Sequence, residues 1–264
     1  VIDSIAPNPP SVTVSPTPTI TKPTPTPTTS SAPKIQISAL TNYNTSNSTI
    51  YSPFNNPNTK LVCLFNEPDG SDYIRNLISN DDYQVSIVSS KIKNNTLSNE
   101  YMSNANTLYT MYKQQTTPQD WTIEFYFYHK AASEYIISEI TEDLTANRYP
   151  AGTTLTRSTV NSSLKYSKNY NNLVFTTWDS YYGYDVDRNL DIQFITEGWY
   201  HCALSCNKNI VRYFINGKQV YTKYASSTNN IRPNFSTNVN KLDSLRITEQ
   251  LLYPVAFTTL PHTI

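Results

Sequence analysis

The chain has 264 residues, a formal net charge of zero and 15% charged side chains, against about 25% in a typical soluble domain. This balance excludes the basic face that a nucleic-acid binder needs, and no apolar run approaches the roughly 20 residues of a membrane span. We therefore expect neither a nucleic-acid partner nor a transmembrane helix. Asn, Ser, Thr and 21 Tyr supply the polarity. Such a surface suits uncharged contacts with glycans or proteins, although an A/T-rich genome would also enrich several of these residues.

Residues 1–34 form a distinct Pro/Thr-rich segment with nine of the 17 prolines, which mostly alternate with threonine from Pro16 to Pro27. Proline fixes φ and removes a backbone donor, so the segment predicts an extended arm or linker. An arm of this kind has no core of its own, and a neighbouring surface would have to order it. The first residues, from Val1, lack the basic and apolar regions of a signal peptide, so we expect a processed chain or a piece of a longer one.

Residues 35–60 read as a polar entry segment with one short strand near 35–40, and residues 61–264 as the folded domain. A turn follows the apolar run 61–65, and it holds Asp69 and Asp72. These two are weak calcium candidates, because their spacing matches no dedicated calcium loop and Asp-Gly is ordinary turn chemistry. No cofactor is expected. A strand is predicted at 83–89, and one or two helical turns are predicted within 101–113.

The clearest single strand is predicted at 121–130. Apolar and polar positions alternate along it with the period of two that a two-faced strand requires, and one face carries Trp121, Ile123, Phe125, Phe127 and His129. Further strands are predicted at 135–141, 173–179, 190–196 and 241–248. Many short strands with turn-rich connections predict an all-β, two-sheet antiparallel jelly-roll sandwich.

The stretch 198–224 predicts two strands followed by a hairpin return. Tyr200, Cys202, Leu204 and Cys206 alternate with Trp199, His201, Ala203 and Ser205. Residues 211–215 form the second strand, and Asn216-Gly217 has the composition of a type I′ turn that leads into the returning strand 218–224.

Three cysteines, Cys63, Cys202 and Cys206, are expected to be buried free thiols. Four residues along one strand separate Cys202 from Cys206 by about 13 Å, beyond the roughly 7 Å that a disulfide spans between Cα atoms. Cys63 could pair with one of them only from a neighbouring strand. His201 falls on the opposite face from both cysteines of its strand, so no metal site is expected there.

Four motifs follow one another along the chain. They are Trp121-Thr-Ile-Glu-Phe-Tyr-Phe-Tyr, Gly198-Trp-Tyr-His-Cys-Ala-Leu, Val211-Arg-Tyr-Phe-Ile-Asn-Gly-Lys, and Leu242-Asp-Ser-Leu-Arg-Ile-Thr, which is followed by Tyr253, Phe257 and Pro261. In this order they resemble the laminin-G-like, concanavalin A-like jelly-roll family. The closing motif is similar to the form of the domain in phage and marine-virus structural proteins. The resemblance implies a curved two-sheet sandwich and places Trp199 in the core. It implies no single activity.

No enzyme is expected. Hydrolases of the resembled family carry paired carboxylates on one face of a strand, whereas Glu139 and Glu142 are three residues apart and point to opposite faces. No serine nucleophile elbow, phosphate loop or HExxH motif is present.

Two functions remain open from the sequence. In the first, the chain is a virion surface protein, a decoration, fibre or tail-associated subunit. Residues 1–34 then attach it to other virion subunits in a homo-oligomer or larger assembly, and the jelly roll faces outward toward host glycans. In the second, it is a carbohydrate-binding or adhesion module of a bacterial surface protein. The predicted contact surface for a glycan or partner is Trp178, Tyr181, Tyr182 and Tyr184, with a tyrosine-rich edge strand as the structural alternative.

Overall fold

The computed structural model describes residues 35–41, 43, 56–78, 80–88, 90–99, 108–114, 117–143, 159–179, 184–224 and 230–258. The chain divides into two compact units, Val1–Pro33 and Lys34–Ile264, and every described residue belongs to the second. Within these ranges no helix is long and apolar enough to cross a membrane.

The described elements are strands that follow one another along the whole unit. In chain order they are β1 (Ile35–Ile37), β2 (Thr59–Cys63), β3 (Tyr83–Ile87), β4 (Lys91–Lys93), β5 (Thr96–Ser98), β6 (Leu108–Tyr112), β7 (Asp120–His129), β8 (Tyr135–Asp143), β9 (Thr159–Ser167), β10 (Asn172–Asp179), β11 (Tyr184–Asn189), β12 (Ile192–Phe194), β13 (Gly198–Asn207), β14 (Ile210–Ile215), β15 (Lys218–Tyr224), β16 (Asn230–Thr237) and β17 (Lys241–Thr248).

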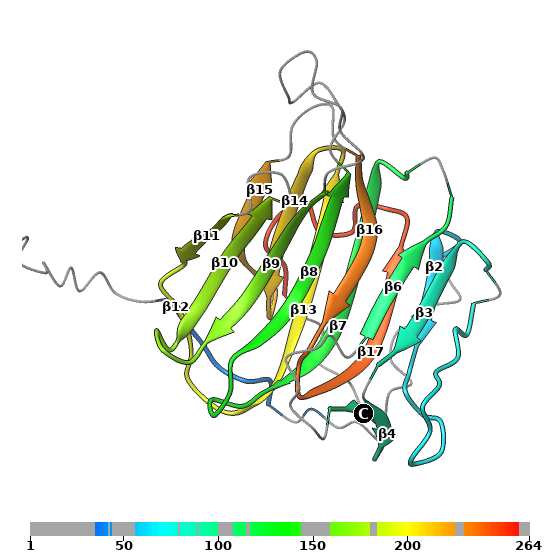
Figure 1. The fold of residues 1–264 in the computed structure, drawn as a ribbon, viewed down its shortest axis with the longest axis horizontal. Helices are drawn as coiled ribbons and strands as arrows, with labels where there is room; N and C mark the ends of the chain where they lie inside the picture. Colours follow the sequence, from blue (N-terminus) through cyan, green and yellow to red (C-terminus); the bar gives the residue numbers. More distant parts are fainter. Residues whose placement is uncertain are drawn as a thin grey trace, which may run out of the picture. The chain divides into compact units, whose positions relative to one another are not determined.

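Two antiparallel sheets pack face to face, as predicted from the sequence (Figure 1). The front sheet has the order β11-β10-β9-β8-β16-β6-β3. The back sheet has the order β15-β14-β13-β7-β17-β5-β4, and β2 also pairs with β17. Non-consecutive neighbours such as β8 and β16, or β7 and β17, mean that the chain crosses between the sheets repeatedly, as in a jelly roll.

The core lies between the sheets, and the alternation of β7 builds much of it. Trp121, Phe125 and Phe127 are fully buried. The Phe125 ring lies 4.9 Å from the ring of Phe235 on the opposite sheet, centroid to centroid. The Trp121 indole N–H donates to the backbone carbonyl of Ile231 at 3.0 Å, which satisfies its one polar group inside an apolar layer. The predicted inward face of this strand is confirmed.

The outer face of the back sheet is also covered, which the sequence did not predict. The segment after β17 folds across it, and the rings of Tyr253 and Phe257 stack there at 3.8 Å. Beneath them the Glu124 carboxylate accepts from Arg246 at 2.6 Å and from the Tyr253 hydroxyl at 2.7 Å. Both faces of β13 are therefore mostly buried.

Trp199 does not lie in the core between the sheets, contrary to the expectation from the resemblance. Tyr200 occupies the inward position and is fully buried, so strand parity places Trp199 on the outer face. There its ring lies 4.8 Å from that of Tyr43 and 5.7 Å from that of Tyr128. The tryptophan thus holds the entry segment against the sheet and stays partly exposed.

The first described residues of the entry segment, 35–41, are attached to the rest of the domain at several points. β1 pairs in parallel with β12. The Ala39 N–H donates to the Thr196 hydroxyl at 3.0 Å, and the Leu40 N–H donates to the Trp199 carbonyl at 2.8 Å. The strand predicted near 35–40 is therefore present and is three residues long.

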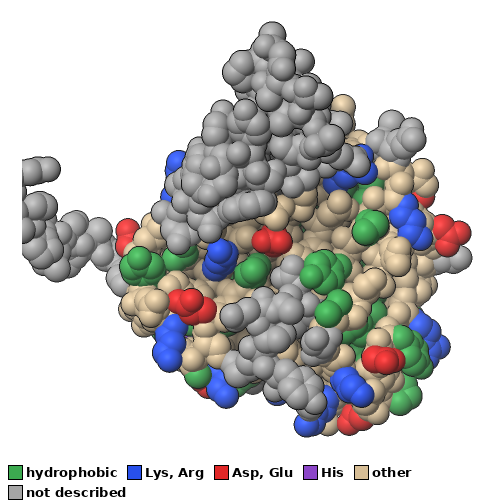
Figure 2. Space-filling view, in the orientation of Figure 1, with side chains coloured by type: hydrophobic (Ala, Val, Ile, Leu, Met, Phe, Trp, Pro, Cys, Tyr) green, Lys and Arg blue, Asp and Glu red, His purple; other side chains and the backbone are tan. Residues whose placement is uncertain are grey.

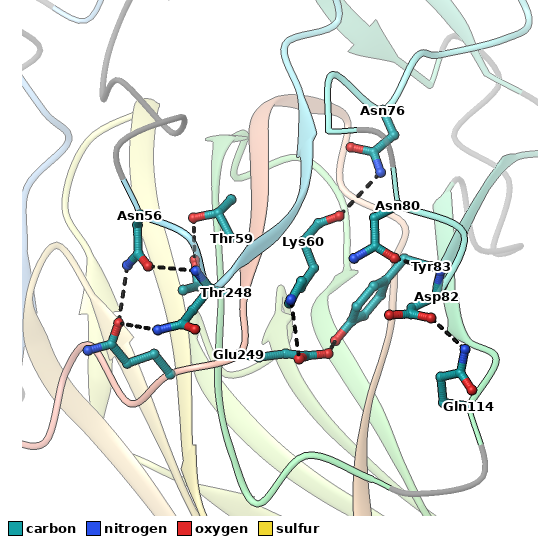
Figure 3. A network of polar contacts seen from close by, with 12 residues as sticks. Asn56, Thr59, Lys60, Asn76, Asn80, Asp82, Tyr83, Gln114, Thr248 and Glu249 are labelled. Atoms are coloured by element: carbon teal, nitrogen blue, oxygen red, sulfur yellow. Dashed lines mark hydrogen bonds and ion pairs between the residues drawn. The ribbon is translucent and has the colours of Figure 1, made fainter.

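A polar network closes the edge where β2, β3 and β17 come together (Figure 3). Glu249, which follows β17, accepts from the Tyr83 hydroxyl at 3.3 Å and lies 4.0 Å from the Lys60 ammonium. Because Tyr83 belongs to the front sheet and Lys60 to β2 of the back sheet, Glu249 links the two layers. Glu249 bonds to Tyr83 and to Lys60 across the two sheets, so we assign the network a structural role.

Two further predictions can be compared with the structure. The helical turns predicted within 101–113 are wrong for the described part, because residues 108–112 form β6. There Leu108, Thr110 and Tyr112 are buried, and Tyr109 and Met111 between them are exposed. The three cysteines are buried and free, as predicted. Burial raises the pKa of the Cys206 thiol to about 12, so the thiol stays protonated and unreactive at neutral pH.

Candidate functional site

A row of outward-facing side chains crosses the front sheet at one level. Successive register pairs place one residue from each of six adjacent strands beside the next, from β10 to β3. We call this the hydroxyl row, and it consists of Thr176, Ser163, Glu139, Ser236, Tyr109 and Ser86. At about 4.8 Å per strand it spans about 24 Å. Five of its six members carry a hydroxyl group, and the sixth is a carboxylate.

Glu139 is the fixed centre of the row. Its Oε2 accepts a hydrogen bond from the Ser163 hydroxyl at 2.9 Å, and its Oε1 accepts one from the Ser236 hydroxyl at 3.3 Å. These neighbours come from the strands on either side of β8, so the carboxylate is oriented by both. A carboxylate has about four acceptor positions. Acceptor capacity beyond these two bonds therefore remains on a half-buried side chain.

A hollow of about 340 Å³ lies beside Glu139. We call it the Tyr109 hollow, and it is lined by Ser86, Tyr109, Thr110, Met111, Glu139, Thr141, Asn234, Phe235 and Ser236. Tyr109 and Met111 are 41% and 57% exposed. The hollow therefore joins an accessible aromatic ring and a thioether chain to hydroxyl, amide and carboxylate groups, within the size range of small-ligand sites.

A second hollow of about 460 Å³ lies on the same sheet, toward the turn between β9 and β10. We call it the Tyr170 hollow. Its lining includes Thr176 of the hydroxyl row, Lys165 and Glu134 as charged groups, and Tyr170, which is 58% exposed. The row thus connects two hollows, each with one accessible tyrosine ring. Uncharged surface predominates over the described part of this side of the molecule (Figure 2).

Buried titratable groups lie behind the row, on the inner side of the sheet. The Lys223 ammonium of β15 reaches across the core and contacts the Ser162 hydroxyl. Burial lowers the pKa of Lys223 to about 7. Burial also lowers the pKa of His129 to about 4, and the Glu197 carboxylate opposes this shift. The two groups belong to the packing between the sheets and not to the outer face.

The predicted contact residues lie at the neighbouring end of the same sheet, as far as they are described. The backbone of Trp178 pairs with Asn161, which in turn pairs with Thr141 of the Tyr109 hollow. The backbone of Tyr184 pairs with Asp179. The side chains of Trp178 and Tyr184, and the whole of Tyr181 and Tyr182, lie outside the described residues. Their role in binding stays a prediction.

The weak calcium candidates lie in an exposed turn. Asp69 Oδ1 accepts the backbone N–H of Asn94 at 2.9 Å, and Asp72 is exposed on the same loop. Among the described residues, no group of three or more His, Cys, Asp or Glu side chains is placed to hold a metal ion.

Sequence reasoning missed the hydroxyl row for a simple reason. Tyr109, Glu139 and Ser236 are far apart in the chain, and each stands among Asn, Ser and Thr without a local motif. The one available signal was the alternation of residues 108–112, which were interpreted as a helix. Glu139 was examined only for a catalytic pair. Among the described residues that line the Tyr109 hollow it is the one carboxylate, so this described lining does not contain the carboxylate pair of a glycoside hydrolase.

The described residues define an antiparallel β-sandwich domain with two hollows on the outer face of one sheet. No family model matches the chain. No curated protein matches it.

Several solved structures align with the chain at low identity. The binding domain of botulinum neurotoxin DC in complex with SialylT aligns at 14% identity and TM-score 0.43, over 74% of this chain and 48% of the other. A Trypanosoma rangeli sialidase in complex with sialic acid aligns at 8% and 0.47, over 74% and 31%. A Caenorhabditis elegans galectin aligns at 10% and 0.35, over 55% and 91%. The chain thus spans less than half of the first two structures. At such identities and TM-scores the likeness carries no argument about ligand or activity.

Proposed function

We propose that the domain is a non-catalytic glycan-binding module and that the outer face of its front sheet is the binding surface. The observation that carries the proposal is the hydroxyl row with the accessible ring of Tyr109 beside Glu139. The proposal rests on the chemistry of the described side chains.

A saccharide presents two kinds of surface. The C–H groups on one side of a sugar ring are apolar, and the hydroxyl groups around its edge both donate and accept hydrogen bonds. Tyr109 and Met111 offer the apolar contact, and Glu139, Asn234 and Ser236 offer acceptors and donors within the same hollow. The Tyr109 hollow and the Tyr170 hollow lie on the same sheet, and each holds one accessible tyrosine ring. Two such hollows suit an oligosaccharide better than a single sugar.

The Pro/Thr-rich residues 1–34 support a tethered module. A chain of this composition holds a domain at a distance from its anchor. We further propose that the anchor is a virion, as the closing motif of the sequence suggests. A bacterial cell surface is the alternative carrier.

A glycan array probed with the full chain tests the binding function. The matched variants are Tyr109→Ala on the binding face and Tyr224→Ala on the edge strand of the back sheet, where Tyr224 is 73% exposed. We expect Tyr109→Ala to weaken binding at least tenfold, because loss of an aromatic anchor costs about 2 kcal/mol or more and about 1.4 kcal/mol is a factor of ten. Tyr224→Ala should bind like the unmodified chain. An array without any bound saccharide would contradict the proposal.

Native mass measurement addresses the carrier. The full chain is compared with a truncation that starts at Ile35. A defined multimer of the full chain, or its retention on particles, together with a monomeric truncation, would support the virion assembly role. Identical monomeric behaviour of both would favour a passive linker and the bacterial-surface alternative.

A further inference from the structure

We infer that the Tyr109 hollow selects uncharged sugars with adjacent hydroxyl groups and rejects acidic sugars such as sialic and uronic acids. This inference deepens the proposed function and rests on it. The observation that carries it is the position of Glu139, whose carboxylate two hydroxyl groups orient in the lining of a hollow where none of the described residues is a cation.

The charges of the two hollows differ. Among the described residues that line the Tyr109 hollow, Glu139 is the one charged residue. The Tyr170 hollow is lined by Lys165 and Glu134, whose formal charges cancel. An anionic ligand in the Tyr109 hollow would therefore place its carboxylate beside a fixed carboxylate, and like charges at close range repel more strongly in a partly dry site than in water.

The hydrogen-bond geometry leads to the same selection. Ser163 and Ser236 already donate to Glu139, one to each carboxylate oxygen. An ionised carboxylate is acceptor-only, so whatever binds its remaining positions has to be a donor. Two adjacent sugar hydroxyls provide two donors at a spacing that can engage both oxygens. The carboxylate of an acidic sugar provides none.

The hydrogen bonds to Glu139 are also charge-assisted, and such bonds are about twice as strong as neutral ones. Glu139 thus contributes both to affinity for neutral sugars and to discrimination against acidic ones. Thr141 and Asn234, which also line the hollow, add uncharged partners and do not offset the charge.

The test is a set of matched probe pairs offered to the full chain. Neutral immobilised oligosaccharides, among them lactose, N-acetyllactosamine and cellotetraose, are placed beside counterparts that carry a sialic or uronic acid. The variants are Glu139→Gln, which removes the charge and keeps the size, and Glu197→Gln, which removes the same charge from an exposed loop between β12 and β13. Thermal melting checks that both variants remain folded.

We expect the neutral member of each bound pair to bind at least tenfold more tightly than its acidic counterpart. Glu139→Gln should weaken the neutral probe at least tenfold and should shrink the difference between the two members, whereas Glu197→Gln should change neither. Equal or tighter binding of the acidic probe by the unmodified chain would overturn the inference and leave the glycan-binding function intact. It would point to the Tyr170 hollow, where Lys165 lies. Absence of binding to every probe would overturn both proposals.

Discussion

Asp243 gives the sharpest test of the energetics, because it is a fully buried carboxylate on the outer face of the back sheet. The Tyr43 hydroxyl donates to its Oδ2 at 2.7 Å, and the Ser244 hydroxyl donates to its Oδ1 at 3.1 Å. Burial nevertheless dominates and raises the pKa of Asp243 from 3.8 to about 7. The carboxyl group is therefore easier to ionise in the unfolded chain than in the folded one.

The direction of the pH effect on stability follows from the higher pKa of Asp243 in the folded state. Between pH 4 and pH 7 the folded state holds a proton on Asp243 that the unfolded state has released, so the contribution of Asp243 to stability falls as the pH rises through this window. The contribution of Asp243 does not change with pH above or below this window. One pKa unit corresponds to about 1.4 kcal/mol, so the whole change amounts to about 4 kcal/mol. This direction is opposite to that of an ordinary salt-bridged carboxylate.

The assay compares Asp243→Asn with the unmodified chain by urea unfolding from pH 4 to pH 8. The amide carries no charge and still offers an oxygen to Tyr43, so the difference between the two proteins isolates the ionisation of Asp243. Other titrating groups, such as His129, are present in both and cancel. We expect the unfolding free energy to move in favour of Asp243→Asn by about 4 kcal/mol between pH 4 and pH 8. A flat difference, or a shift in the opposite direction, would refute the reasoning.

Two further predictions concern packing. Trp121→Ala should cost about 3–5 kcal/mol of unfolding free energy, as large-to-small changes in a core do. Trp199→Ala should cost clearly less, because the Trp199 ring is partly exposed on the outer face. Thermal melting of both variants tests this difference, and an equal loss of stability would contradict the placement of Trp199 outside the core. Gly198→Ala should also destabilise the fold, because an added Cβ would meet the Cβ of Ala39 at 2.6 Å and the φ of Gly198 is +147°. We expect faster hydrogen exchange at the backbone amides of Ala39 and Leu40 in this variant. Unchanged protection of these two amides would refute the close contact.

The part of the fold that the sequence predicts is the part in which one strand carries its own signal. The segment from Trp121 to His129 alternates so regularly that the strand and its inward face can be predicted before any pairing is known. The turn at Asn216-Gly217 can also be predicted from the sequence, because Asn-Gly favours the positive φ angles of a type I′ turn. Both residues adopt positive φ in the structure. β9 was missed, because its outward positions Asn161, Ser163 and Lys165 are polar and its inward positions include Ser162 alongside Leu164.

The site could not be predicted, because it exists only once strands from distant parts of the chain are paired. Tyr109 comes beside Ser236 through the pairing of β6 with β16, and Ser236 comes beside Glu139 through the pairing of β16 with β8. The prediction for Trp199 was wrong for a different reason. A large aromatic residue on a strand was expected in the core, yet parity and the covering entry segment place it outside.

The attachment of the entry segment also has a mechanical consequence. Any tension that reaches the domain through the residues before Ile35 acts first on β1, which three register pairs join to β12. The next contacts along the chain are the backbone hydrogen bonds of Ala39 and Leu40 and then the hydrogen bond that the Tyr43 hydroxyl donates to buried Asp243. A load would be resisted by successive bonds spread over nine residues, so the segment should peel away in stages before the sandwich itself bears the strain.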